Sequence, residues 1–317
     1  MLKKKWHKWL AFVLLLVVTL FLLEKAFDFG LTHNLNLKAS YVSTRRVNAQ
    51  LLVLGPCEPL WMVSPQVLAE KTGLSCYNLA SSHSDFADNY LHLRLYLANN
   101  SVPQFLLLYV TPESFDLRYN TFHSYRFAPF LNDAEIRQTV EENDPSYAGL
   151  SRIPFMRYGY YTHQVAFQAV QGWKHYFTDK KAPYYPDGFE PPAQIVWDNH
   201  HENMKKLYPK GYSFEWDSTR ERYFIKILDL CAAKRIGVVL YESPILREIA
   251  DFQVNRGLFL DKIRNAAEDR DIPYMLFDGL PWAGNRKYFI SPMVTSLEGA
   301  YLFSDTLGGL LREKIVK

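Results

Sequence analysis

A short apolar run that ends in a turn constrains this chain more than any other stretch. Leu51–Leu54 is continuously apolar and is closed by Gly55 and Pro56, which is typical of a buried strand in a parallel sheet. Apolar residues at roughly helical spacing follow, so Cys57 lies where a strand ends and a helix begins. Sites in open α/β sheets form outside the carboxyl ends of the strands. The stretch therefore makes Cys57 a candidate site residue, although most cysteines are inert core residues.

The alternation of apolar runs and helical patterns continues along most of the chain. It predicts a three-layer α/β sandwich with a five-stranded parallel sheet and right-handed crossovers. About a hundred residues, 115–216, lack this rhythm, and this is too long for a simple loop. We expect an inserted, partly helical, aromatic-rich subdomain there. The other expected strands are Ser75–Leu79, Phe105–Val110, Gly237–Tyr241 and Pro273–Phe277, and the expected helices are Ser64–Thr72, Asp85–Asn99, Arg220–Lys234, Leu246–Asp269 and Leu297–Lys314.

The N-terminal segment predicts a membrane anchor. A basic tip precedes the apolar run Trp9–Leu23, which is long for a signal-peptide core and short for a spanning helix of about 17–25 residues. No small-residue cleavage site follows, and flanking aromatic residues extend the apolar run, so we favour an uncleaved helix over a cleaved signal peptide. Lys3, Lys4, Lys5 and Lys8 place the N-terminus in the cytoplasm. The expected organisation is an anchor at 1–30, a juxtamembrane linker at 31–48 and an extracytoplasmic domain at 49–317.

Composition narrows the classes of function and site. The net charge of +3 is too small to favour a nucleic-acid partner. The three cysteines, Cys57, Cys76 and Cys231, are too few and odd in number for a disulfide framework. Adjacent histidines such as His200 and His201 point in different directions, so we expect no metal site there and no cofactor.

Several short motifs follow the predicted strands. The first strand leads to Gly55-Pro56-Cys57-Glu58, the second to Asn78-Leu79-Ala80 and the third to Thr111-Pro112-Glu113; the last helix begins near Gly299-Ala300. This layout resembles the SGNH (GDSL-like) hydrolase superfamily. The membrane-anchored branch is most similar, with proteins of teichoic-acid D-alanylation and of alginate and cellulose O-acetylation.

The resemblance assigns roles to positions in this sequence. Cys57 takes the place of the nucleophilic serine, and Ala80 and Thr111 lie in the oxyanion region. Counting back from Gly299, Ser291 takes the place of the catalytic aspartate and Val294 that of the catalytic histidine. Neither can do that work, because valine takes no proton and serine carries no charge to stabilise an imidazolium. The resemblance thus implies a degenerate hydrolase site.

An alternative is an active cysteine site that has moved its base. A free thiol, with a pKa of about 8.5, needs less activation than a serine. His83 and Asp85 lie in the loop after the second strand, where His83 would be the base and Asp85 would orient it. The competing interpretation is that Asp85 caps the next helix and His83 is an ordinary loop histidine.

The resemblance also implies partners. A protein of this kind is expected at the bacterial cytoplasmic membrane, held in the bilayer by its N-terminal helix. It would serve as an accessory or scaffold subunit in acyl modification or assembly of a cell-envelope polysaccharide, beside a multi-spanning membrane acyltransferase. A purely structural subunit is a further alternative. A glycan or protein partner would be sought on the aromatic insertion, at Phe122, Tyr125, Tyr160, Tyr161, Tyr184, Tyr185 and Trp197.

Overall fold

The computed structural model describes residues 2–118, 122–150, 153, 155–159, 162–192, 197 and 200–315. The chain forms two compact units. The α1 unit comprises Met1–Arg46 and Phe122–Tyr184, and the sheet unit comprises Val47–Thr121 and Tyr185–Lys317. The expected insertion is therefore divided: residues 122–184 join the N-terminal segment, whereas residues 185–216 fold with the sheet.

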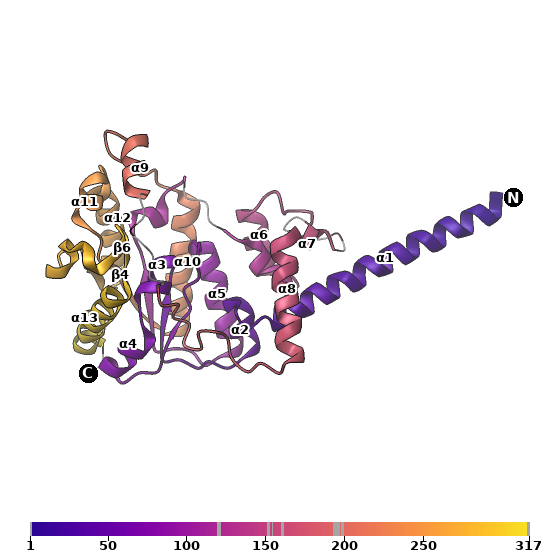
Figure 1. Cartoon of the computed structure of the whole chain (residues 1–317), viewed down its shortest axis with the longest axis horizontal. Coiled ribbons are helices and arrows are strands. Elements are labelled where there is room, and N and C mark those ends of the chain that lie inside the picture. The colour runs from indigo at the N-terminus through magenta and orange to yellow at the C-terminus, as the bar shows by residue number, and fades with distance from the viewer. Residues whose placement is uncertain are drawn as a thin grey trace. The chain divides into compact units, whose positions relative to one another are not determined.

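The sheet unit is built on a five-stranded parallel sheet with strand order β2-β1-β3-β4-β5, which confirms the expected α/β class (Figure 1). In register, Leu51 of β1 pairs with Cys76 of β2 and Phe105 of β3, and Leu240 of β4 pairs with Tyr274 of β5. The strand order changes direction between β1 and β3, where a site is expected in such sheets. The strands are β1 (Leu51–Leu54), β2 (Cys76–Asn78), β3 (Phe105–Tyr109), β4 (Gly237–Glu242) and β5 (Tyr274–Leu276).

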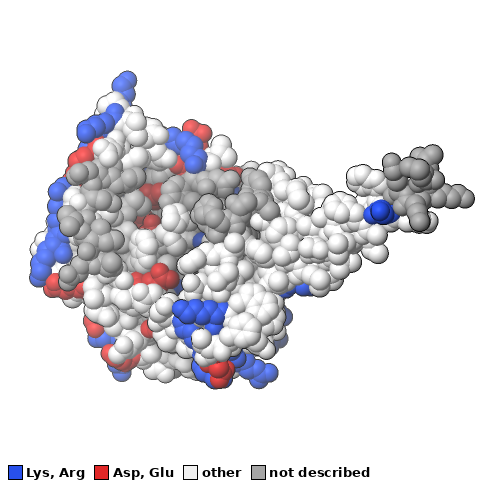
Figure 2. Space-filling model, turned by 45° about the vertical axis from the view of Figure 1, so that its right-hand side comes forward, with Lys and Arg blue, Asp and Glu red and all other residues white. Residues whose placement is uncertain are grey.

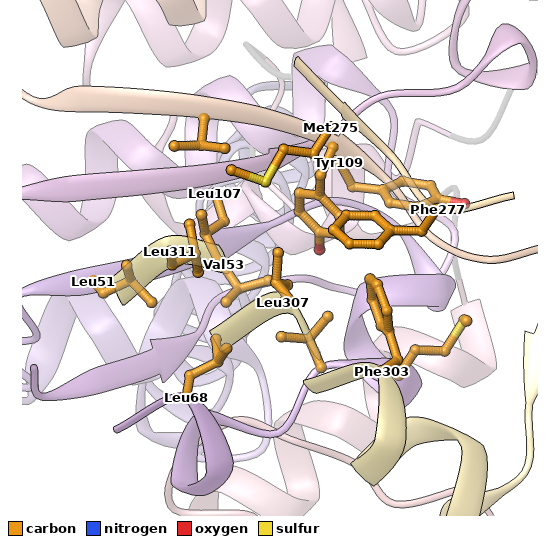
Figure 3. Packing of buried hydrophobic residues seen from close by; sticks show 14 residues of the cluster. Leu51, Val53, Leu68, Leu107, Tyr109, Met275, Phe277, Phe303, Leu307 and Leu311 are labelled. Atoms are coloured by element: carbon orange, nitrogen blue, oxygen red, sulfur yellow. The ribbon is translucent and has the colours of Figure 1, made fainter. Parts of the chain in front are cut away.

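Helices cover both faces of this sheet. On one face, α13 packs against α3 and α4, and on the other α10 packs against α5. Alternate strand residues face α4 and α13, and Figure 3 shows them meeting Leu68, Phe303 and Leu307 in a buried apolar cluster. The remaining elements are α3 (Cys57–Met62), α4 (Pro65–Thr72), α5 (Phe86–Asn99), α9 (His200–Leu207), α10 (Ser218–Lys234), α11 (Arg247–Phe252), α12 (Arg256–Glu268), α13 (Leu297–Ile315) and the hairpin β6 (Phe289–Ser291) and β7 (Val294–Thr295).

Local sequence signals explain where these helices begin and end. Helix α4 starts after Ser64, whose side chain accepts from the Val67 N–H, and ends at Gly73 in the left-handed conformation, as Ser and Gly at these positions predict. The single helix expected over 246–269 is wrong: α11 ends at Phe252 and α12 starts at Arg256. The helix ends there because the Phe252 carbonyl and the Val254 N–H form hydrogen bonds with the Tyr212 backbone instead of with helical partners.

The α1 unit is helical. Helix α1 is unbroken, and its Trp6–His33 stretch has the length and hydropathy of a membrane span, with no part of its most apolar window buried. Figure 2 shows that the surface along most of this helix is uncharged, with a basic side chain near its tip. The segment expected to be a linker, 31–48, instead contains helix α2, which packs on α1. The helices of this unit are α1 (Leu2–His33), α2 (Lys38–Thr44), α6 (Ala134–Asn143), α7 (Met156–Gly159) and α8 (Thr162–Phe177).

Candidate functional site

A pocket lies at the carboxyl ends of β1 and β3 in the sheet unit. Its cavity volume is about 190 Å³. Turns after β1, β2 and β3 supply Cys57, His83 and Thr111, and the far wall comes from Tyr212 and Phe252. The pocket therefore forms at the change of strand order, where polar groups from separate strands converge.

Cys57 is the first residue of α3, and its sulfur is hydrogen-bonded within the loop after β2. The Ser82 hydroxyl lies 3.3 Å from the Cys57 Sγ, and the His83 backbone N–H donates to that sulfur over 3.2 Å. The same Ser82 hydroxyl lies 2.8 Å from Nδ1 of the His83 ring. The structure thus brings Cys57 and His83 together, with Ser82 between thiol and imidazole. Sequence reasoning missed Ser82 because a serine in a small-residue loop carries no distinguishing pattern.

Asp85 is placed as a helix cap. Its carboxylate accepts from the backbone N–H groups of Ala87 and Asp88 at the start of α5, in a capping box. Burial raises the pKa of this carboxyl, and the Arg220 guanidinium acts in the opposite direction. This is the arrangement of the competing sequence interpretation, in which Asp85 caps α5. The hydroxyl of Ser82, rather than this carboxylate, is what the His83 Nδ1 meets.

The two backbone amides of the expected oxyanion region already have partners inside the protein. The Ala80 N–H donates to the Asn78 side-chain oxygen over 3.0 Å. The Thr111 N–H donates to the Ser114 hydroxyl over 3.1 Å. Thr111 lines the pocket, and its hydroxyl lies 3.2 Å from the hydroxyl of Ser114.

The two positions that correspond to the catalytic aspartate and histidine, Ser291 and Val294, lie on the β6–β7 hairpin. Val294 packs against the apolar cluster beneath the sheet, and Ser291 ends β6. Between them, Met293 lines the pocket. The hairpin therefore contributes an apolar thioether to this wall at the place where the resemblance would put an acid and a base.

Two glutamates, Glu58 and Glu113, line the pocket together with Cys57. Burial raises the pKa of Glu58 to about 7, and the nearby Glu113 charge adds to this rise. Burial likewise raises the pKa of Glu113, whose carboxylate accepts from the Gln253 amide over 2.5 Å. At the end of β4, Glu242 forms a bidentate pair with Arg256 at 2.8 and 2.7 Å. The sequence signal for this cluster was a glutamate just after the first and third strands and at the end of the fourth.

Part of the far wall comes from residues of the expected insertion, among them Asp116, Met204 and Tyr212. The Tyr212 hydroxyl donates to the buried Asp116 carboxylate over 2.5 Å, and Arg118 lies over the Tyr212 ring at 4.4 Å. Met204 of α9 also lines the pocket. The insertion thus supplies an aromatic and a thioether wall, together with a phenol held by a carboxylate.

No group of three or more His, Cys, Asp or Glu in the described ranges is arranged to hold a metal ion. His201 is buried and lies edge-on to Phe252 with ring centroids 5.5 Å apart. Among the insertion aromatics, Tyr184 is 77% exposed, whereas Trp197 packs with a small apolar cluster. Tyr160, Tyr161 and Asp198 lie outside the described residues, as does the side chain of His200.

Comparison with known proteins finds distant structural neighbours. The sequence matches no protein-family model and no curated protein. A GDSL-like lipase of Bacteroides thetaiotaomicron is similar over 85% of this chain and 88% of that chain, with a TM-score of 0.39 and 10% sequence identity. A candidate acylhydrolase of Bacteroides fragilis is similar over 86% and 88%, with the same TM-score and identity. At these values no activity is carried over to this chain.

Proposed function

We propose that this chain is a membrane-tethered, extracytoplasmic accessory protein in the acyl modification or assembly of a bacterial cell-envelope polysaccharide. In this role its pocket binds a ligand without the chemistry of a serine hydrolase. Its partner would be a multi-spanning membrane acyltransferase. The lysines in the first turns of α1 support a cytoplasmic N-terminus, and the apolar, uncovered surface of α1 supports the tether.

One observation carries the proposal that the hydrolase chemistry is lost. The pocket is formed, but the hairpin that would bring the aspartate and histidine presents Met293, while Val294 packs into the core. Loss of triad members typically costs several orders of magnitude in rate. A shaped cavity without that machinery fits a binding role better than a hydrolytic one.

A second candidate function is acyl transfer through Cys57, and the hydrogen-bonded Cys57, Ser82 and His83 favour it. The thiolate would attack an acyl ester and form a thioester, and the departing alcohol would take up the proton that left the thiol through Ser82 and His83. An acceptor hydroxyl would then attack the thioester, and its proton would return to the sulfur. A sulfur that accepts an N–H hydrogen bond is suited to carry the negative charge this step needs.

The two functions are separated by complementation in the bacterium that produces the protein. The readout is ester-linked acyl groups released from envelope polysaccharide by mild alkali. Deletion of the gene should lower the acyl content, and wild-type protein should restore it. For the accessory role, Cys57→Ala restores it as well. Acyl content that is unchanged by deletion would contradict both candidates.

Intact-protein mass spectrometry with p-nitrophenyl acetate tests the thiol directly. The accessory role predicts no acetyl adduct on Cys57 of the full chain, and the second candidate predicts a thioester there. Cys76 and Cys231 are internal controls, because burial raises the pKa of each thiol to about 12. An adduct that is absent in Cys57→Ala and turns over on addition of an alcohol would replace the accessory role with the enzymatic one.

A further inference from the structure

We propose that helix α8 lies in the lipid headgroup region, with an apolar face turned toward the bilayer that α1 enters. This α8 apolar face consists of Phe167, Val170 and Phe177. The inference rests on the membrane tether of the proposed function and adds a second lipid contact to it. It concerns the α1 unit alone.

Helix α8 is fixed to α1 by a very close approach. A Cβ on Gly172 would lie 1.6 Å from the Gly30 carbonyl oxygen, and a Cβ on Gly30 would lie 2.4 Å from the Ala169 carbonyl oxygen. Beside this contact the Trp173 Nε1 donates to the Ala26 carbonyl over 3.0 Å. The two helix backbones are therefore in direct contact, and this contact fixes the position of α8 relative to α1.

The two helices cross at this contact and do not run alongside each other. Trp173 reaches back to Ala26, whereas two residues later His175 Nδ1 meets the Leu35 N–H at 3.2 Å. Two nearby residues of α8 therefore contact positions nine residues apart in the N-terminal segment, one before and one after Gly30. Figure 1 shows α8 lying across the end of α1. If α1 spans the bilayer, a helix that crosses it extends along the membrane surface.

The position of the crossing along α1 sets its height above the hydrocarbon. The apolar run ends at Leu23, and Gly30 is seven residues further, which is about 10 Å at 1.5 Å per residue. A helix with side chains has a radius of about 5 Å, so the near side of α8 comes to about 5 Å from the hydrocarbon boundary. The headgroup region of one leaflet is about 5–8 Å thick. The near side of α8 thus falls within it.

The side chains of α8 fit that environment. Phe167 is 60% exposed, Val170 64% and Phe177 75%, and they recur at helical spacing with Trp173, whose side chain reaches toward the membrane end of α1. Lys174 is exposed beside them and suits anionic headgroups. An exposed apolar face with a lysine beside it is typical of a helix that lies in the membrane surface.

Charges at the same level of α1 are paired inside the protein. Arg157 of α7 lies 2.6 Å from Glu24 and 2.7 Å from Asp28, and the Tyr158 hydroxyl also donates to Asp28. Glu24 follows the apolar run directly, and Asp28 lies about one helical turn further on. Their pairing lowers the free-energy cost of placing charged groups close to lipid. This end of the α1 unit can therefore lie in the lipid headgroup region.

Depth-dependent quenching of a fluorescent label tests the proposal. The full chain carries Cys57→Ala together with Val170→Cys or Phe177→Cys, is labelled with bimane and is reconstituted in vesicles of phosphatidylethanolamine and phosphatidylglycerol. Leu258→Cys in the sheet unit is the matched exposed control at 67%. Leu16→Cys in α1 reports the tether itself. Cys76 and Cys231 remain, since their raised thiol pKa, about 12 for each, keeps them slow to label.

The expected result is that brominated acyl chains quench the labels at 170, 177 and 16 but not at 258. Iodide in the aqueous phase should quench the labels at 170 and 177 at least about threefold less than the label at 258. If the label at 16 is quenched by lipid while those at 170 and 177 behave like 258, the placement of α8 is wrong and the tether stands. If the label at 16 is also untouched by lipid, the tether and the placement fail together. The vesicles hold no other protein, so a partner protein cannot produce the expected result.

Discussion

Two clusters of buried charged groups, one in the α1 unit and one beside Cys57 in the sheet unit, are arranged in opposite ways. In the α1 unit, one arginine, Arg157, lies between Glu24 and Asp28, and its side chain is only 7% exposed. In the sheet unit, Glu58 and Glu113 approach each other beside Cys57, and both carboxyl pKa values are raised by burial. In the cluster of the α1 unit each buried charge has a partner of opposite sign, and such ion pairs hold the helices together. Poorly compensated charges in a pocket are typical of functional sites.

The largest effect is expected from removing the arginine that pairs with Glu24 and Asp28 in the α1 unit. Arg157→Ala should destabilise the α1 unit by about 3 kcal/mol, because it removes the guanidinium that pairs with both of the largely buried carboxylates of Glu24 and Asp28. Hydrogen exchange of the α8 amides in the full chain measures this. Arg264→Ala is the control, since its pair with Asp261 is exposed and should contribute less than about 1 kcal/mol. Equal exchange in the two variants would mean that the buried pairing is not structural.

Steric contact in the α1 unit gives the next effect. Gly172→Ala should cost about 2–3 kcal/mol, because the new Cβ meets the Gly30 carbonyl oxygen and the helices must separate. Gly257→Ala in α12 meets nothing within 4 Å and should be neutral or stabilising by about 1 kcal/mol. Thermal unfolding of the full chain in detergent compares them. A Gly172→Ala protein as stable as Gly257→Ala would show that the α1–α8 contact is loose.

The poorly compensated arrangement should respond to pH. The folded protein holds the Glu58 proton more tightly than the unfolded chain, with a pKa of about 7 against 4.5. Its contribution to stability therefore falls as pH rises from about 4.5 through 7, by up to about 3 kcal/mol. Glu58→Gln should flatten this part of a plot of Tm against pH. Glu70 is exposed, so Glu70→Gln should leave the dependence of Tm on pH unchanged. If the Glu58→Gln protein still loses stability between about pH 4.5 and 7, a group other than Glu58 is responsible for the loss.

The smallest expected effect concerns Ser82. Ser82→Ala removes the hydroxyl between Cys57 and His83. It should slow alkylation of Cys57 by iodoacetamide about fivefold, the value of one hydrogen bond of about 1 kcal/mol. Ser81→Ala is the neighbouring control, because Ser81 bonds Gly55 through its backbone N–H. Identical rates for the two variants would remove Ser82 from the description of the site.

The amino-acid sequence alone determined the sheet and its local boundaries. The apolar runs placed all five strands to within one or two residues, and Ser64, Gly73 and Asp85 marked helix ends that the structure confirms. These features are local, because hydrophobic periodicity and capping involve residues a few positions apart. The same local rules also suggested the thiol at the carboxyl end of β1.

Tertiary structure alone decided which groups meet. Ser82 lies against Cys57 although 25 residues separate them, and the Glu24–Arg157 pair joins the two segments of the α1 unit. Most of the expected linker became part of that unit because α2 packs on α1 and because Asn34 and Leu35 form hydrogen bonds with α8. Such contacts depend on how closely backbones approach and on which side chains then fill the space. No periodicity in a single sequence encodes that choice, so the pocket's carboxyl groups and the α1–α8 crossing emerge only once the chain is folded.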